Sequence, residues 1–130
     1  MNFTGKIVVI TGAGGGIGRA TALAFAHAGA TLVLADIDAG LGEETLAQVR
    51  ARGTEADFIR ADVSRSADVR AYVAAALDRH GRIDCFFNNA GIEGKVGPIY
   101  EVEEDAFDAI IAVNLKGVFL GLRHVLPVML

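Results

Sequence analysis

The chain reads Thr11-Gly12-Ala13-Gly14-Gly15-Gly16-Ile17-Gly18 between an apolar run at residues 7–10 and a helical pattern of small residues at 17–28. A strand that leads straight into a helix leaves the first amides of the helix without intrahelical partners, and the helix dipole adds partial positive charge there. An anion satisfies both, and glycines let it approach the main chain closely. The stretch therefore predicts a turn that binds a diphosphate.

Three glycines of this turn have separate predicted roles. Gly12 makes the tight turn, Gly16 lets the phosphates approach main-chain amides, and Gly18 lets the helix pack close to the strand. Gly14 and Gly15 are expected to keep the loop wall free of bulk. The N–H of Ile17 is expected to face the phosphate.

A second apolar run, residues 32–35, ends in Asp36. An acid about 20 residues after the glycine turn is where dinucleotide-binding sites place the carboxylate that binds the adenosine ribose. A carboxylate accepts from both ribose hydroxyls but repels a 2′-phosphate, and Ile37 and Asp38 follow rather than an arginine. The prediction is therefore NAD as cofactor in preference to NADP, with capping of the next helix as the alternative role of Asp36.

The rest of the pattern alternates strands with helices, which predicts an α/β fold of the Rossmann type, a doubly wound parallel sheet. Strands are expected at residues 7–10, 32–35, 57–61 and 83–87, and right-handed crossovers favour the order 3-2-1-4. The strand at 57–61 is polar at its start, at Asp57, so we expect it at an edge of the sheet. Residues 1–130 are read as a single dinucleotide-binding domain.

The spacing T-G-x-x-x-G-x-G, the segment Asn88-Asn89-Ala90-Gly91 and Asn114 together resemble the classical short-chain dehydrogenase/reductase family. The resemblance covers essentially the whole chain. It implies that further strands extend the sheet beyond residues 83–87 in a complete member, so the domain looks incomplete at its C-terminal side. The exposed apolar edge left at residues 83–87 would invite pairing.

The resemblance also implies ligand contacts. Asp62 would accept from the exocyclic amine of adenine with Val63 beside the ring, whereas the alternative is an aspartate that only ends a strand before a helix. Asn89, Ala90 and Gly91 would line the adenosine ribose and steady the sheet, and the alternative there is an ordinary turn, because Asn and Gly are turn residues.

Asn114 lies among the apolar residues of a long helix expected at residues 103–129. The resemblance implies that Val113 lies beside the nicotinamide. A buried amide left unpaired costs about 1–3 kcal/mol, so we expect Asn114 to have a partner. The resemblance implies a catalytic asparagine that positions a water in a proton relay to a lysine. A core asparagine bonded to a neighbouring strand is the alternative.

The resembled family also uses a catalytic serine and a Tyr-x-x-x-Lys pair, and the chain lacks the Tyr-x-x-x-Lys pair. Neither Tyr72 nor Tyr100 has a lysine four residues on, because Ala76 and Glu104 stand there. The resemblance therefore implies the cofactor-binding half of an NAD-dependent oxidoreductase that moves hydride between a nicotinamide and a secondary alcohol or ketone. The alternatives are a non-catalytic nucleotide-binding fragment and a methyltransferase-like domain, in which the Asn segment would have no role.

Composition narrows the class of partners. The net charge of −4 has no basic cluster, so we expect neither nucleic acid nor a membrane surface as partner. The single Cys85 cannot form an internal disulfide, and no signal peptide or apolar run of about 20 residues is evident, so we expect a cytoplasmic protein. His27, His80 and His124 lack ligand spacing and are read as surface residues, with no metal site.

The helix from Glu103 to Met129 has apolar or small residues on two faces. One face is expected to pack on the sheet. The second face predicts contact with another subunit, that is, a homo-oligomer.

Overall fold

The computed structural model describes all residues 1–130, and its centre is a four-stranded parallel sheet in the order β3-β2-β1-β4. The strands are β1 (Ile7–Thr11), β2 (Thr31–Asp36), β3 (Ala56–Arg60) and β4 (Cys85–Phe87). The order 3-2-1-4 and the edge position of β3 are therefore confirmed. The other edge is β4, also as expected.

The strand predicted at residues 83–87 is shorter than expected. The ladder pairs Val8 with Cys85 and Ile10 with Phe87. Ahead of it, the Asp84 carboxylate accepts from the Ile7 N–H at 2.8 Å, so a side chain takes the place of a ladder carbonyl. The Asp84 N–H still donates to the Ile7 carbonyl at 2.9 Å, and the regular ladder begins at Cys85.

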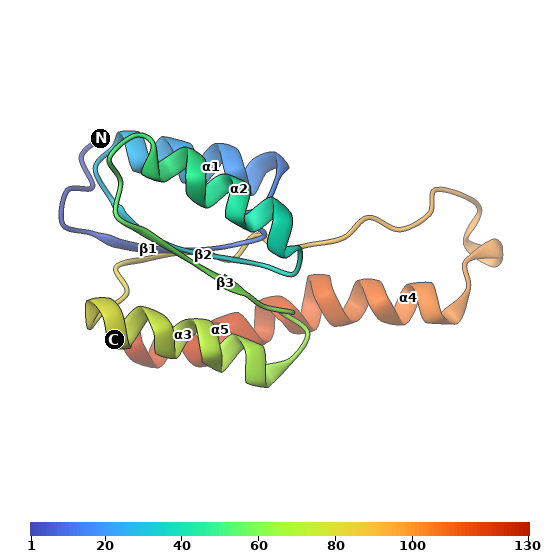
Figure 1. Cartoon of the computed structure of the whole chain (residues 1–130). Coiled ribbons are helices and arrows are strands. Elements are labelled where there is room, and N and C mark those ends of the chain that lie inside the picture. The colour runs from blue at the N-terminus through green and yellow to red at the C-terminus, as the bar shows by residue number, and fades with distance from the viewer.

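Two helical layers cover the sheet (Figure 1). The helices α1 (Gly16–His27) and α2 (Ala39–Arg50) lie on one face, and α3 (Ser66–His80) and α5 (Gly117–Met129) lie on the other. Alternate strand residues supply the two cores. Val8, Ile10, Leu32 and Leu34 belong to one apolar cluster, whereas Ile7, Val9, Val33 and Ala35 belong to the other. This two-sided burial explains why β1 and β2 are continuous apolar runs.

The glycine turn leaves β1 and enters α1. Gly12 has φ +66° and Gly16 has φ +52°, both in the region where glycine is favoured. A Cβ on Gly18 would overlap the Gly12 carbonyl, so Gly18 is required for α1 to lie this close to the turn. The tight turn at Gly12 and the close packing at Gly18 follow the roles expected of them.

The last helix is not uniformly α-helical as the periodicity predicted. It comprises α4 (Glu104–Ile110), a π-helical segment η2 (Ile111–Lys116) and α5, with a short 3₁₀ turn η1 (Ile99–Glu101) before it. A π segment adds a residue to a turn and rotates the residues that follow, and such segments are frequent at functional sites. Helical spacing alone does not reveal it. The helix continues past Pro127 to Met129.

One face of this helix packs on the sheet through Gly117, Leu120, Gly121 and Val125. Its other face exposes a row of large apolar side chains: Phe107, Ile111, Leu115, Phe119, Leu122, Leu126 and Met129, here called the apolar stripe. Figure 1 shows α4 extending beyond the end of the sheet.

The same helix, Glu104–Met129, is long and apolar enough to cross a membrane by length and composition, because an 18-residue window of it has a mean hydropathy of 1.5. The sequence-based expectation that no such run exists was therefore wrong. A single helix of this kind is weak support for a membrane span, because core helices of soluble proteins meet the same criteria.

Candidate functional site

A cavity of about 110 Å³ opens at the carboxyl ends of the strands. Ligands of open α/β sheets bind at such an edge, where the strand order reverses. The cavity is lined by Gly12, Asp36, Ile37, Ala61, Asp62, Val63, Ala90, Gly91, Ile92 and Val113. Segments far apart in the sequence thus meet in one place, and seven of the expected site residues are among them: Gly12, Asp36, Asp62, Val63, Ala90, Gly91 and Val113.

Asp36 is held against the glycine turn at the end of β2. Its Oδ2 accepts from the Gly14 N–H at 2.8 Å, and its Oδ1 accepts from the Asp38 N–H at 2.9 Å. The cap of α2 is Asp38, whose carboxylate accepts from the Leu41 N–H at 2.9 Å. The alternative that Asp36 caps the next helix is therefore not what the structure shows.

Asp62 follows β3 and faces the same cavity. Its carboxylate accepts from both the hydroxyl and the N–H of Ser64, at 2.6 Å and 2.9 Å. The Ser64 hydroxyl is the main reason that the pKa of Asp62 lies below its usual value, and nearby Arg65 and Arg60 act in the same direction. Asp62 is therefore an anion with a fixed orientation at the cavity edge.

Asn89 and Ala90 connect β4 to the glycine turn through Thr11. The buried Thr11 hydroxyl accepts from the N–H groups of Asn89 and Ala90 at 3.0 Å and 3.1 Å. The Asn89 side chain donates to the Thr11 carbonyl at 3.1 Å. Asn89 thus faces the main chain rather than the cavity, while Ala90 and Gly91 line the cavity. The neighbouring Asn88 donates to the Val118 carbonyl on α5 at 3.0 Å.

Asn114 lies in the π-helical segment and is paired with the main chain after β4. Its Oδ1 accepts from the Ile92 N–H at 2.8 Å, and its Nδ2 donates to the Ile92 carbonyl at 2.9 Å. The expectation of a buried Asn114 was wrong, because the residue is exposed. The expected partner is present, and it fixes the wall formed by Gly91 and Ile92. Val113, beside it, lines the cavity.

The other expected residues lie at the start of α1, outside the cavity. Gly15 is the N-cap position and Gly16 the first helical residue, and no side chain caps this helix. The side chain of Ile17 is 71% exposed, and Gly18 is packed against Gly12. The helix therefore offers uncapped amides beside the turn.

Two polar neighbours of the site were missed by sequence reasoning. Thr11 ends a buried strand and carries the only side-chain hydroxyl in the turn, and this hydroxyl can be recognised in the sequence. Arg60 is the register partner of Asp36 across β2 and β3, and its Nε donates to the Ile37 carbonyl at 3.2 Å. No arginine adjoins Asp36 along the chain, but this one does in space, and only the strand register reveals it.

The histidines differ partly from the expectation of surface residues. The His80 side chain is 7% exposed, and its Nε2 lies 3.1 Å from an oxygen of Asp57, so that part of the prediction was wrong. His124 lies with its Nε2 3.1 Å from the Ser66 hydroxyl. No group of three or more His, Cys, Asp or Glu side chains is arranged to hold a metal ion.

Comparison with known proteins places this geometry in a family. The family model described as short chain dehydrogenase matches residues 6–130. Levodione reductase of Leifsonia aquatica is 48% identical over 129 residues, which make up 98% of this chain and 48% of that protein. Its crystal structure superposes with a TM-score of 0.95.

Solved structures of related proteins carry different cofactors. A short chain dehydrogenase/reductase from Burkholderia phymatum in complex with NAD is 43% identical with a TM-score of 0.96, covering 100% of this chain and 46% of that one. A metagenomic short-chain oxidoreductase in complex with NADP is 37% identical with a TM-score of 0.91, covering 98% and 57%.

The chain spans about half the length of the curated relatives it matches. Within that span, the match covers nearly every residue, and the cavity lies where the strand order reverses. The chain belongs to the short-chain dehydrogenase family.

Proposed function

We propose that these residues bind NAD for a short-chain oxidoreductase, which transfers hydride between a nicotinamide and a secondary alcohol or ketone. The observation that carries the proposal is the convergence of the glycine turn, Asp36 and Asp62 on one cavity at the carboxyl ends of the strands.

The residues present fit a dinucleotide. The start of α1 has no side-chain cap, and its first turn holds no acidic residue, so its amides are available to a diphosphate. The Asp36 and Asp62 carboxylates stand on the cavity wall, where ribose hydroxyls and an adenine amine are suitable donors. Apolar Val63 and Ile37 supply surfaces for a planar ring.

NAD is proposed over NADP because of charge. The Asp36 carboxylate would repel a 2′-phosphate, and the Nε of its neighbour Arg60 is engaged with the Ile37 carbonyl. Because Arg60 is the register partner of Asp36 across β2 and β3, we expect the preference for NAD to be partial rather than absolute. The NAD complex of the Burkholderia phymatum relative supports the proposal, and the NADP complex of the metagenomic relative shows that the fold admits both.

When bound, the nicotinamide supplies or accepts the hydride. The residues described here bind and orient it, and Asn114 holds the cavity wall near Val113 through its two bonds to Ile92. The chain contains no Tyr-x-x-x-Lys pair. We therefore assign cofactor binding, and not proton transfer to the substrate, to these residues. That Asn114 positions a water in a proton relay stays a prediction.

The apolar stripe is the proposed subunit contact. Its seven side chains lie along one face of α4, η2 and α5 and are exposed in the single chain. Contiguous apolar surface of this kind marks an interaction site. Light scattering of a variant with Leu115 and Phe119 both changed to Glu should show fewer subunits than the unchanged protein.

A direct titration tests the cofactor proposal. NADH, NADPH and adenosylmethionine are titrated separately, following nicotinamide fluorescence for the first two and heat for the third. Tighter binding of NADH than NADPH supports the proposal. Binding of adenosylmethionine without NADH would replace it with a methyltransferase-like function, and NADH binding without turnover of alcohols or ketones would favour a non-catalytic module.

A further inference from the structure

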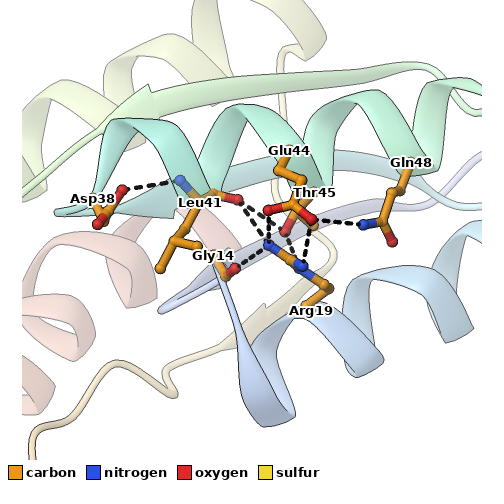
Figure 2. A network of polar contacts seen from close by, with 7 residues as sticks. All are labelled: Gly14, Arg19, Asp38, Leu41, Glu44, Thr45 and Gln48. Atoms are coloured by element: carbon orange, nitrogen blue, oxygen red, sulfur yellow. Dashed lines mark hydrogen bonds and ion pairs between the residues drawn. The ribbon is translucent and has the colours of Figure 1, made fainter.

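Arg19 occupies the first turn of α1 and reaches across to α2 (Figure 2). Its Nη2 donates to the Gly14 carbonyl at 2.6 Å and lies 3.3 Å from the Leu41 carbonyl. Its Nε donates to the Thr45 hydroxyl at 2.9 Å, and its two terminal nitrogens meet the Glu44 carboxylate at 3.0 Å and 3.1 Å. Every nitrogen of the guanidinium group therefore has a protein partner.

The peptide groups on either side of Gly14 are held by different elements. The Gly14 N–H donates to Asp36 at the end of β2, and the Gly14 carbonyl accepts from Arg19. A Cβ at this position would lie 2.9 Å from both the Asp36 carboxylate and the Leu41 side chain. The turn is thus clamped between the end of β2 and the first turns of α2.

The remaining contacts of Arg19 tie the glycine turn to α2. The Thr45 side chain is fully buried, and its hydroxyl lies 3.2 Å from the Leu41 carbonyl while it accepts from Arg19. Because the Arg19 side chain is only 22% exposed, its fork is held in one geometry. Movement of the turn relative to α2 would break several of these bonds together.

We propose that Arg19 is a positioning residue for the diphosphate turn: its bond to the Gly14 carbonyl sets the distance between the turn and Asp36. That distance must match the separation of the ribose and the diphosphate of a dinucleotide. Arg19 therefore raises affinity for ligands that contain both groups, without touching them. The inference rests on the proposed function, because it concerns the same cavity.

We expect the hydrogen-bond geometry of Arg19, rather than its charge, to raise the affinity for ligands that contain both ribose and diphosphate. The Glu44 carboxylate pairs with the guanidinium in a two-point contact and offsets its charge. A lysine would keep the charge but could not reach Gly14, Thr45 and Glu44 at once. Lysine and leucine at position 19 should therefore behave alike.

The test measures the dissociation constants of ADP and adenosine for the whole protein by calorimetry. Adenosine contains the ribose alone, whereas ADP also contains the diphosphate. Both Arg19→Leu and Arg19→Lys should weaken ADP about tenfold, the scale of one lost charged hydrogen bond, and adenosine less than about threefold. The ratio of the two constants separates loss of positioning from general destabilisation.

Two matched variants serve as controls. Arg52→Leu removes an exposed arginine whose bond is to the Gln48 carbonyl within α2, and it should leave both ligands unchanged. Glu44→Gln leaves the bonds of Arg19 to Gly14 and Thr45 in place, so ADP affinity should stay within about threefold.

Several results would overturn the inference. Unchanged ADP affinity in Arg19→Leu would do so, as would recovery of affinity in Arg19→Lys, or equal weakening of adenosine and ADP. If Arg19→Leu does not fold, Thr45→Val removes one acceptor with little change in shape. It should weaken ADP about threefold and spare adenosine, and no change would count against the inference. Failure of the unchanged protein to bind ADP or NADH would instead reject the proposed function.

Discussion

Thr11 and Asn89 exchange hydrogen bonds between the ends of β1 and β4. The Thr11 hydroxyl accepts from the Asn89 N–H at 3.0 Å, and the Asn89 amide returns a bond to the Thr11 carbonyl at 3.1 Å. The same hydroxyl accepts from the Ala90 N–H. One small, fully buried side chain thus satisfies two partly buried main-chain donors, at the point where the cavity wall begins.

Replacing Thr11 with Val should therefore destabilise the fold. Two N–H groups lose their acceptor while the volume is kept, and we expect a loss of about 2 kcal/mol in the free energy of unfolding. Urea denaturation measures it. Thr31→Val, at the start of β2 and without a side-chain bond, is the control and should change stability by less than about 0.5 kcal/mol. Equal effects at both positions would contradict the role of Thr11.

Replacing Tyr72 with Phe should stabilise the protein. The Tyr72 hydroxyl is fully buried and has no hydrogen-bond partner, so its removal deletes a desolvated polar atom. We expect a gain of about 1 kcal/mol in the free energy of unfolding. Tyr100→Phe, at a position 84% exposed, should have no effect. A loss of stability in Tyr72→Phe would show that the hydroxyl has a partner, such as a buried water.

Stability should also fall at alkaline pH because of the same residue. Burial raises the pKa of Tyr72 above its ordinary value of 10.0, so the unfolded chain releases this proton at lower pH than the folded one. The contribution is complete below that ordinary pKa and is lost as pH rises above it. Denaturation curves between about pH 9 and 11 should fall more steeply for the unchanged protein than for Tyr72→Phe. Parallel curves would refute the assignment.

Gly18→Ala should damage the turn, whereas Gly15→Ala should spare the fold. A Cβ on Gly18 would overlap the Gly12 carbonyl, while one on Gly15 meets nothing within 4 Å. Gly15 has φ −163°, which any residue adopts. We expect Gly18→Ala to cost more than about 2 kcal/mol and Gly15→Ala less than about 0.5 kcal/mol, by thermal unfolding. Comparable losses would mean that α1 can shift away from Gly12.

Changing Asp36 to Ala together with Ile37 to Arg should move the preference from NADH toward NADPH. The double variant removes a charge that repels a 2′-phosphate and adds one that attracts it. We expect the ratio of the two dissociation constants to change by at least about tenfold at low salt and less at high salt. Asp38→Asn, which alters the cap of α2 but not the ribose carboxylate, is the control. An unchanged ratio would remove Asp36 from cofactor selection.

Much of the fold was predictable because its signals are local. Apolar runs at β1 and β2, the glycines at turns and the acid after β2 each depend on neighbouring residues only. The parallel order followed from handedness, and the cavity residues Asp62, Ala90 and Val113 followed from the family resemblance.

The rest depended on how distant segments pack. Asn114 is exposed and lies in the π segment, whose extra residue per turn leaves no trace in helical spacing. His80 is buried because the end of α3 meets Asp57 at the sheet edge. Arg60 is beside Asp36 only through the register of β2 and β3. None of these relations can be read from one segment alone.

The pair formed by Asn114 and Ile92 has a mechanical meaning. A side-chain amide offers one donor group and one acceptor, so Asn114 pairs with both main-chain groups of Ile92 as a peptide group of a strand would, five residues after β4 has ended. The main chain at Ile92 is consequently held in place by two hydrogen bonds from Asn114. Residues 93–98 therefore leave the sheet from a point that is tied to the long helix rather than to a neighbouring strand.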